Sequence, residues 1–125
     1  MSISHTDSLV DLVRQRVDHP LLICDDERIS YRDADRRSAA VARGLVDLGV
    51  GKGTHIGLLY PNGVDFVVGM LAAARIGAVV VPYSTFQTAD ELHTQLLASD
   101  TSIMLATRSF RHHDYQQRLD AATAP

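Results

Sequence analysis

Apolar residues recur at the three- and four-residue spacing of one helix face in two stretches of the first half of the chain. One stripe contains Leu9, Leu12, Val13 and Val17, and the other contains Ala34, Val41, Leu45 and Leu48. Arg36, Arg37 and Arg43 fall on the opposite side of the second stripe. The pattern predicts two amphipathic helices whose apolar sides face a core.

Helix starts are marked by polar residues that are followed three positions later by an acid. The pairs are Ser8 with Asp11, Ser30 with Asp33, Asn62 with Asp65, and Thr88 with Glu91. In each pair the first side chain can accept a hydrogen bond in the first helical turn, and the acid suits the positive end of the helix dipole. Gly49 and Gly77 stand where a left-handed residue would end the second and third helices.

Short apolar runs lie between these predicted helices. They span Leu21 to Cys24, His55 to Tyr60, Ala78 to Val81, and Ser102 to Ala106. Because they do not alternate strictly with polar residues, they are typical of strands buried on both faces. Strands that alternate with helices predict an α/β fold with a mainly parallel sheet. A last amphipathic helix is predicted from Ser109 to Ala122, with Tyr115, Leu119 and Ala122 on its apolar side.

The predicted helix from Gly63 to Ile76 is apolar around nearly its whole circumference. Its charged residues, Asp65 and Arg75, lie at opposite ends, where each suits the helix dipole. A helix of this kind needs cover on all sides. Two explanations stay open: it is a central core helix of a compact domain, or one of its faces packs against chain outside these 125 residues.

Composition places the chain among globular proteins, with 46% hydrophobic and 22% charged residues in a length of 125. We expect residues 1–125 to form a single α/β unit. The formal net charge of -3 argues against a nucleic acid partner. The longest apolar run is too short for a transmembrane segment, and residues 1–7 do not resemble a signal peptide. Cys24 is the one cysteine, which fits a reducing cytoplasm.

The glycine-rich segment from Gly49 to Thr54 superficially resembles a phosphate-binding loop. Such a loop follows a strand, opens a helix and carries Gly-Lys-Ser/Thr at its end. Here Lys52 is followed by Gly53, and the segment joins a helix to a strand, so the polarity is reversed. A tight turn is the better interpretation, and Lys52 is assigned no catalytic role.

The other reactive side chains form no convincing constellation. His112, His113 and Asp114 are adjacent on a predicted helix, where neighbouring side chains diverge, so we expect a solvated face and not a metal site. His5, His19, His55 and His93 are scattered along the sequence. Cys24 has no local basic cluster, and Ser84 is in no nucleophile motif.

Two junctions follow predicted strands, at Tyr60-Pro61-Asn62 and at Pro82-Tyr83-Ser84. In open α/β sheets, ligand crevices form beyond the carboxyl ends of the strands, so these residues could line a pocket. The favoured alternative is that the prolines stop the strands and Asn62 caps the next helix.

Several of these landmarks occur in the order of a known family. They are Ile29-Ser30-Tyr31-Arg32-Asp33, the helix from Ala39 to Gly49, Gly51-Lys52-Gly53, Tyr60-Pro61-Asn62, the segment from Leu71 to Pro82, and Glu91-Leu92. Over residues 8–107 the chain resembles the start of the adenylate-forming superfamily, especially acyl-CoA synthetases. Asp33 and Ala34 depart from the family pattern, in which glutamate and leucine stand.

The resemblance implies the N-terminal segment of a larger adenylating domain. The parent would be an ATP-dependent carboxylate–CoA ligase for a fatty or other hydrophobic acid, with ATP, Mg²⁺ and coenzyme A as cofactors. The family's phosphate loop, acidic ATP motifs and catalytic lysine come later in its sequences, and no stretch here matches them. For this segment we therefore expect no catalytic, cofactor-binding or metal-binding residue, and no activity of its own.

Two roles stay open for the chain itself. In the first it is part of a parent ligase and packs against the remainder of that protein. In the second it is a truncated relative that acts as a non-catalytic interaction or dimerisation module, pairing with itself through exposed apolar surface.

Overall fold

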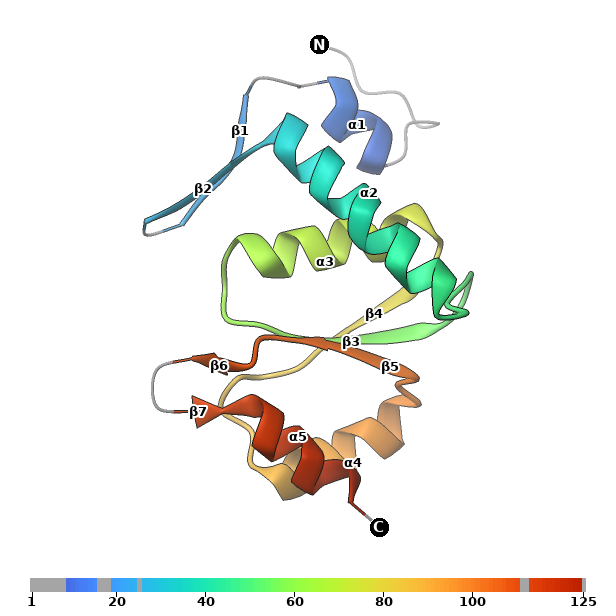
Figure 1. The fold of residues 1–125 in the computed structure, drawn as a ribbon, viewed down its shortest axis with the longest axis vertical. Helices are drawn as coiled ribbons and strands as arrows, with labels where there is room; N and C mark the ends of the chain where they lie inside the picture. The colour runs from blue at the N-terminus through green and yellow to red at the C-terminus, as the bar shows by residue number, and fades with distance from the viewer. Residues whose placement is uncertain (1–8, 16–18, 25, 111–112, 125) are drawn as a thin grey trace.

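A parallel sheet of three strands in the order β4-β3-β5 forms the centre of the molecule (Figure 1). The computed structural model describes residues 9–15, 19–24, 26–110 and 113–124. β3 spans His55–Leu59, β4 spans Val79–Pro82, and β5 spans Ile103–Ala106. Helices α2 (Tyr31–Asp47) and α3 (Val64–Arg75) lie on one face of the sheet, and α4 (Ala89–Ser99) and α5 (Tyr115–Thr123) lie on the other. The predicted α/β architecture with a parallel sheet is confirmed.

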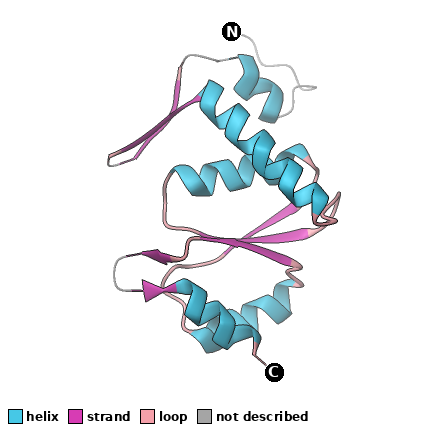
Figure 2. Cartoon of the chain, in the orientation of Figure 1, coloured by secondary structure: helices cyan, strands magenta, loops and turns pink. Residues whose placement is uncertain are grey.

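Two antiparallel hairpins and one short helix complete the fold (Figure 2). α1 (Leu9–Gln15) packs on α2 and α3. β1 (Pro20–Cys24) pairs with β2 (Glu27–Ser30), and β6 (Ser109–Phe110) pairs with β7 (His113–Asp114). The placement of Leu21 to Cys24 in the parallel sheet was therefore wrong. This segment lies instead in a separate antiparallel pair with β2, in which Cys24 is opposite Glu27.

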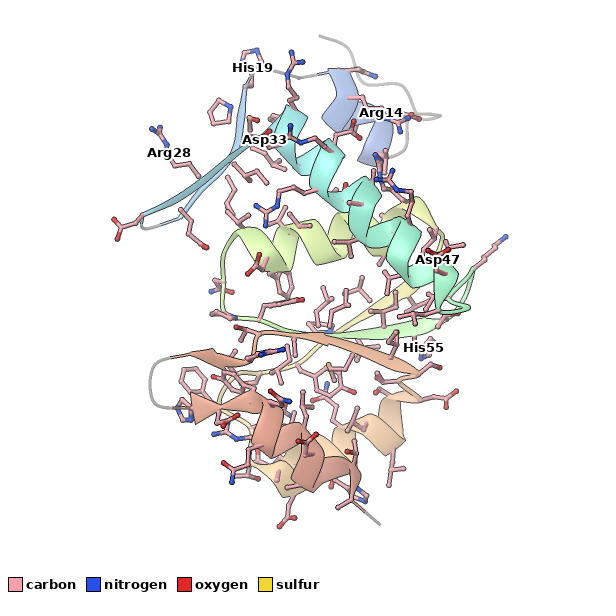
Figure 3. All side chains as sticks on the ribbon, in the orientation of Figure 1. Arg14, His19, Arg28, Asp33, Asp47 and His55 are labelled. Carbon is pink, nitrogen blue, oxygen red and sulfur yellow. The ribbon has the colours of Figure 1, made fainter. Side chains whose placement is uncertain are left out.

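Side chains fill the space between the sheet and the helices on both faces (Figure 3). On one face, Ile56 and Leu58 of β3 pack with Leu45 of α2 and with two alanines of α3, Ala72 and Ala73. On the other face, Leu59 of β3 packs with residues of α4 and α5 and with the loop residue Tyr83. The central strand therefore contributes to the core on both sides.

The apolar helix α3 is covered by elements of this chain. It contacts α1, α2, β2, β3 and β4. The carboxyl-terminal part of its buried face belongs to the sheet-side core, and Val64, Val68 and Leu71 pack with Ile29 and Ala34 near the β1–β2 hairpin. The packing is that of a central core helix.

The cap predictions have mixed outcomes. The Ser30 side chain accepts a hydrogen bond from the Asp33 backbone at the start of α2, and Thr88 forms a reciprocal capping box with Glu91 at the start of α4. Asn62 does not cap α3, which was a wrong prediction, because the N-cap residue is Gly63 and no side chain of the N-cap bonds the helix. Ser8 lies outside the described residues.

Two helix ends differ from the sequence predictions. Gly49 and Gly77 have φ values of 89° and 71°, as expected for left-handed residues after α2 and α3. Leu48 was placed on the apolar face of α2, but it is 72% exposed because the helix has already ended at Asp47. The last helix begins at Tyr115 and not at Ser109, because residues on both sides of 111–112 pair as β6 and β7 and Asp114 then caps α5.

Candidate functional site

The carboxyl ends of the parallel strands place Tyr60 beside a cavity of about 300 Å³. Tyr60 follows β3 directly, and Leu105 of β5 lies in the same wall. α2 contributes Arg37 and α3 contributes Asp65 and Gly69 to the remaining walls. This is the end of an α/β sheet at which ligand crevices form. The pocket interpretation of the first junction thus holds for Tyr60.

The polar groups of this cavity are a phenol and an ion pair. Arg37 Nη2 donates to Asp65 Oδ1 at 3.3 Å, which joins α2 to α3. Burial raises the pKa of the Tyr60 phenol above its ordinary value of 10.0, and the Asp65 carboxylate raises it further. The cavity therefore presents the neutral hydroxyl of Tyr60 beside the Arg37–Asp65 ion pair, whose two charges neutralise each other. Among the described residues that line it, none is a serine, cysteine, lysine or histidine that could act as a nucleophile or base.

Tyr83, at the second junction, is part of the core. Its side chain is 5% exposed, and its hydroxyl lies 2.7 Å from Thr101 Oγ1 and 3.0 Å from Ser99 Oγ. Ser99 Oγ in turn donates to the Gln95 carbonyl. Ser84 is exposed, and its hydroxyl accepts a hydrogen bond from the Phe86 backbone in the following turn. At this second junction Tyr83 is therefore a buried core residue.

The segment from Gly49 to Thr54 is the tight helix-to-strand turn that the sequence favours. The Gly51 N–H donates to Thr54 Oγ1, and the Gly53 N–H donates to the Gly77 carbonyl. The turn leads into the amino end of β3, away from the Tyr60 cavity, and Lys52 is exposed. Its geometry is not that of a phosphate-binding loop, which precedes a helix.

Three described histidines are engaged as local structural contacts. Nδ1 of His55 lies 2.6 Å from the Ser99 carbonyl, and Nδ1 of His93 lies 2.7 Å from the Ala122 carbonyl, so each ring donates at this nitrogen. His113 Nδ1 accepts a hydrogen bond from Arg118 Nη2 at 2.8 Å. His113 and Asp114 lie in β7, not on the predicted helix, and His112 lies outside the described residues.

In the described ranges, no three histidine, cysteine, aspartate or glutamate side chains gather as a metal-binding group. Cys24 is the last residue of β1. No helix among the described elements combines the length and apolar character needed to cross a membrane.

Sequence reasoning missed a second depression, of about 580 Å³, beside α5. Phe86, which is 82% exposed, lies at its rim, and Arg118 lines it. The Arg118 guanidinium donates to the Gln87 carbonyl and lies 5.1 Å from the centre of the Tyr115 ring. Through these contacts the Arg118 side chain links α5, to which it belongs, with the loop before α4. The contact of Arg118 with Gln87 joins residues 31 positions apart, so no local pattern in the sequence marks it.

Comparisons with known proteins agree over most of the chain. Residues 10–125 match the family model of the AMP-binding enzymes. 4-Coumarate–CoA ligase 5 of Oryza sativa subsp. japonica is 34% identical over 106 residues, which cover 83% of this chain and 20% of that protein. A medium/long-chain-fatty-acid–CoA/3-oxocholest-4-en-26-oate–CoA ligase of Mycobacterium marinum is 31% identical over 101 residues, covering 81% of this chain and 18% of that one.

A solved structure from Rhodopseudomonas palustris CGA009, provisionally named a long-chain-fatty-acid CoA ligase, has a TM-score of 0.80 and 26% identity. The matched region covers 94% of this chain and 30% of the chain in that structure. The chain therefore spans about a fifth of the length of the two curated relatives, and under a third of this structure.

Proposed function

The chain belongs to the AMP-binding enzyme family, and we propose that it is the N-terminal segment of an ATP-dependent acyl-CoA synthetase. The observation that carries this proposal is the family match over residues 10–125, combined with relatives about five times as long. In the proposed reaction, ATP and a carboxylate give an acyl-adenylate and pyrophosphate. Coenzyme A then displaces AMP to form a thioester, and Mg²⁺ neutralises phosphate charge in the first step.

Within that parent, residues 1–125 act as a structural unit and supply no catalytic residue. The described residues that line the Tyr60 cavity supply a hydrogen-bonding phenol and a charge pair, and none of them is a serine, cysteine or lysine nucleophile. Lys52 lies in a turn at the amino end of the sheet. In our proposal the ATP, Mg²⁺ and coenzyme A sites lie in the remainder of the protein, and these residues are an incomplete portion of one adenylating domain.

The proposed substrate is a fatty or other hydrophobic acid. The two curated relatives are named for 4-coumarate and for medium- or long-chain fatty acids and a cholestenoate, all of which carry extensive apolar surface. The negative net charge gives no support to a nucleic acid partner, and a chain with one cysteine suits a reducing cytoplasm.

Pyrophosphate release and hydroxamate trapping, with a panel of aliphatic and aromatic acids, test this assignment. The full-length product of the gene should release pyrophosphate with at least one hydrophobic acid, whereas the 125-residue chain should match a control without enzyme. Turnover by the 125-residue chain would refute its inactivity. A full-length product that activates no acid would count against the ligase assignment.

The second candidate function is an interaction module that dimerises. It is favoured by large apolar side chains on the surface, since Leu48, Phe86 and Leu97 are 72%, 82% and 71% exposed. Such residues lower their free energy when a partner covers them. A stop codon directly after Pro125 and a dimer in light scattering would favour this role. A monomer that binds no hydrophobic dye would argue against it.

A further inference from the structure

Asn62 is the one asparagine of the chain, and a glycine, Gly63, follows it. Asparagine is among the thermolabile residues, because its side-chain amide can be attacked by the backbone nitrogen of the next residue. Glycine hinders that attack least, since it has no Cβ and its backbone moves freely. The sequence therefore places the chain's one asparagine in its most reactive context.

The structure places this pair in an exposed connection between two elements. β3 ends at Leu59 and α3 begins at Val64, so Asn62 and Gly63 lie in the bend that joins them (Figure 1). Asn62 is exposed. Connections of this kind run over the surface and lack the regular backbone hydrogen bonds of a helix or strand. Water and hydroxide therefore reach this position.

The Gly63 nitrogen is not engaged by the start of α3. Gly63 is the N-cap residue, and its carbonyl accepts a hydrogen bond from the Val67 N–H at 3.3 Å. No residue in the described part of the chain accepts a hydrogen bond from the Gly63 N–H. This nitrogen can therefore react without the loss of a hydrogen bond to a described residue.

We propose that Asn62 is a site of spontaneous deamidation, with the Gly63 nitrogen as the nucleophile and water as the co-reactant. The deprotonated nitrogen forms a bond to Cγ of Asn62. The bond from Cγ to Nδ2 then breaks, ammonia leaves, and a cyclic succinimide remains. Water opens this ring at either carbonyl carbon, without oxidation or reduction. Opening at Cγ gives aspartate, and opening at the main-chain carbonyl carbon gives isoaspartate.

The product adds a negative charge where two carboxylates already lie. Glu27 Oε2 accepts a hydrogen bond from the Val64 N–H at 3.2 Å, and Asp65 is in the first turn of α3. A third carboxylate, at position 62, repels both. Isoaspartate also lengthens the main chain by a methylene directly before Gly63. The isoaspartate product therefore weakens the contact between Glu27 and Val64.

The same change reaches the Tyr60 cavity. Tyr60 and Asp65 both line this cavity, and the bend that contains Asn62 connects them. A longer main chain in the bend displaces one of these walls relative to the other. Deamidation is therefore a slow covalent change at the edge of the candidate site. It needs water alone, so it is independent of the ligase assignment.

Ageing of the full-length gene product at neutral and mildly alkaline pH tests the reaction. Trypsin releases the peptide from Gly53 to Arg75, which contains Asn62 but no glutamine and no second asparagine. Its mass should rise by the difference between an amide and a carboxylic acid. The rise should be faster at the higher pH, because base removes the proton from the attacking nitrogen.

Two controls accompany this measurement. An unaged sample, digested in parallel, corrects for conversion during digestion. The Asn62→Gln variant should show no mass gain over the same period, because glutamine must close a larger ring. An unchanged peptide from the folded protein, under conditions that convert the urea-unfolded protein, would overturn the proposal.

The ratio of the products tests the role of Gly63. A succinimide should give both products, with isoaspartate in excess. Methyl transfer from S-adenosylmethionine by a protein isoaspartate methyltransferase labels isoaspartate and not aspartate. Aspartate as the sole product would mean direct attack of water on the amide, and this would overturn the assignment of Gly63 as the nucleophile.

Amide hydrogen exchange at Val64 tests the consequence for α3. In the isoaspartate form, purified from the aged protein, Val64 should exchange at least about tenfold faster than in the unaged protein, because its acceptor is withdrawn. Asn62→Asp is the matched control, since it adds the charge without the longer main chain, and it should retain more of the protection. Equal exchange in these two forms, or unchanged exchange in the isoaspartate form, would overturn the role of the longer main chain.

Discussion

The Glu27 carboxylate accepts a hydrogen bond from the Val64 backbone N–H at 3.2 Å, although the two residues are 37 positions apart. Glu27 lies in β2, and Val64 is the first residue of α3. The N-cap position itself is Gly63, which has no side chain to bond the helix. A Cβ at Gly63 would occupy the place of the Glu27 carboxylate oxygen, so glycine leaves room for a cap from another element.

Removal of this distant cap should destabilise the chain. Glu27→Ala should lower the free energy of unfolding by about 0.5–2 kcal/mol, because an N–H at the start of α3 loses its acceptor and the helix dipole loses a favourable charge. Glu27→Gln keeps an acceptor and should cost less. Urea denaturation measures both. The neighbouring exposed Arg28 is the control, and an Arg28→Ala cost equal to that of Glu27→Ala would contradict this role.

Gly57 in the central strand should not tolerate alanine. A Cβ there would lie 2.7 Å from Tyr83 Cε1 and 2.8 Å from Met104 Sδ. The Tyr83 ring cannot move away freely, because hydrogen bonds to Ser99 and Thr101 hold its hydroxyl. We expect Gly57→Ala to cost about 1–3 kcal/mol of stability.

Gly44 provides the matched control for this substitution. It lies in α2, and a Cβ there would meet no atom within 4 Å. Gly44→Ala should raise the thermal midpoint, by the equivalent of about 0.5–1 kcal/mol, because alanine has the higher helix propensity. Scanning calorimetry should therefore show shifts of opposite sign, and two shifts of the same sign would disprove the steric argument.

The ion pair of Arg75 and Asp35 should contribute more to stability than the surface pairs. Arg75 Nη2 lies 2.5 Å from Asp35 Oδ1, and its side chain is only 10% exposed. Arg75→Ala should cost about 1–3 kcal/mol, because Asp35 then loses its buried partner. Arg36, paired with Asp33 on the surface at 2.9 Å, should cost under about 1 kcal/mol when truncated. Chemical denaturation in low and high salt separates the two, and a larger salt effect at Arg75 would contradict the burial argument.

Tyr60 should ionise at a higher pH than a free tyrosine. Its pKa is raised mainly by burial and secondarily by Asp65, so the folded state favours the neutral phenol. The stability that this group contributes is complete below pH 10.0 and is lost as the pH rises through the folded pKa. Absorbance titration of the wild type minus Tyr60→Phe isolates the transition.

The Asp65→Asn variant shows whether burial or the Asp65 charge contributes more to the raised pKa of Tyr60. It should lower the Tyr60 pKa but leave it above the ordinary value, because burial is the larger cause. A return of the Tyr60 pKa to 10.0 in this variant would show that the charge, and not burial, dominates.

The sequence predicted features whose signals are local. Ser30 and Thr88 were identified as caps because each bonds a residue three positions away. The wrong assignment of Asn62 has the opposite cause, since the acceptor comes from Glu27 in β2, a strand that none of the apolar runs marks. Leu21 to Cys24 has the composition of a buried parallel strand. Composition does not show which strand it pairs with, and in the folded chain its partner is β2, in the antiparallel direction.

The Tyr60 cavity could be predicted in part. The order of strand and helix placed Tyr60 at the carboxyl end of β3, where crevices form. The approach of Arg37 to Asp65 depends on the packing of α2 on α3, which joins residues 28 positions apart. No short-range pattern encodes that distance. The residues around the cavity therefore became apparent only in the folded chain.

The central strand has a consequence for how the molecule comes apart. Ile56, Leu58 and Leu59 of β3 are all fully buried, and they serve the packed layers on both faces of the sheet. Loss of either layer would therefore expose side chains of the strand on which the other layer rests. The two layers should melt together, in a single transition that tryptic cleavage and circular dichroism report at the same temperature.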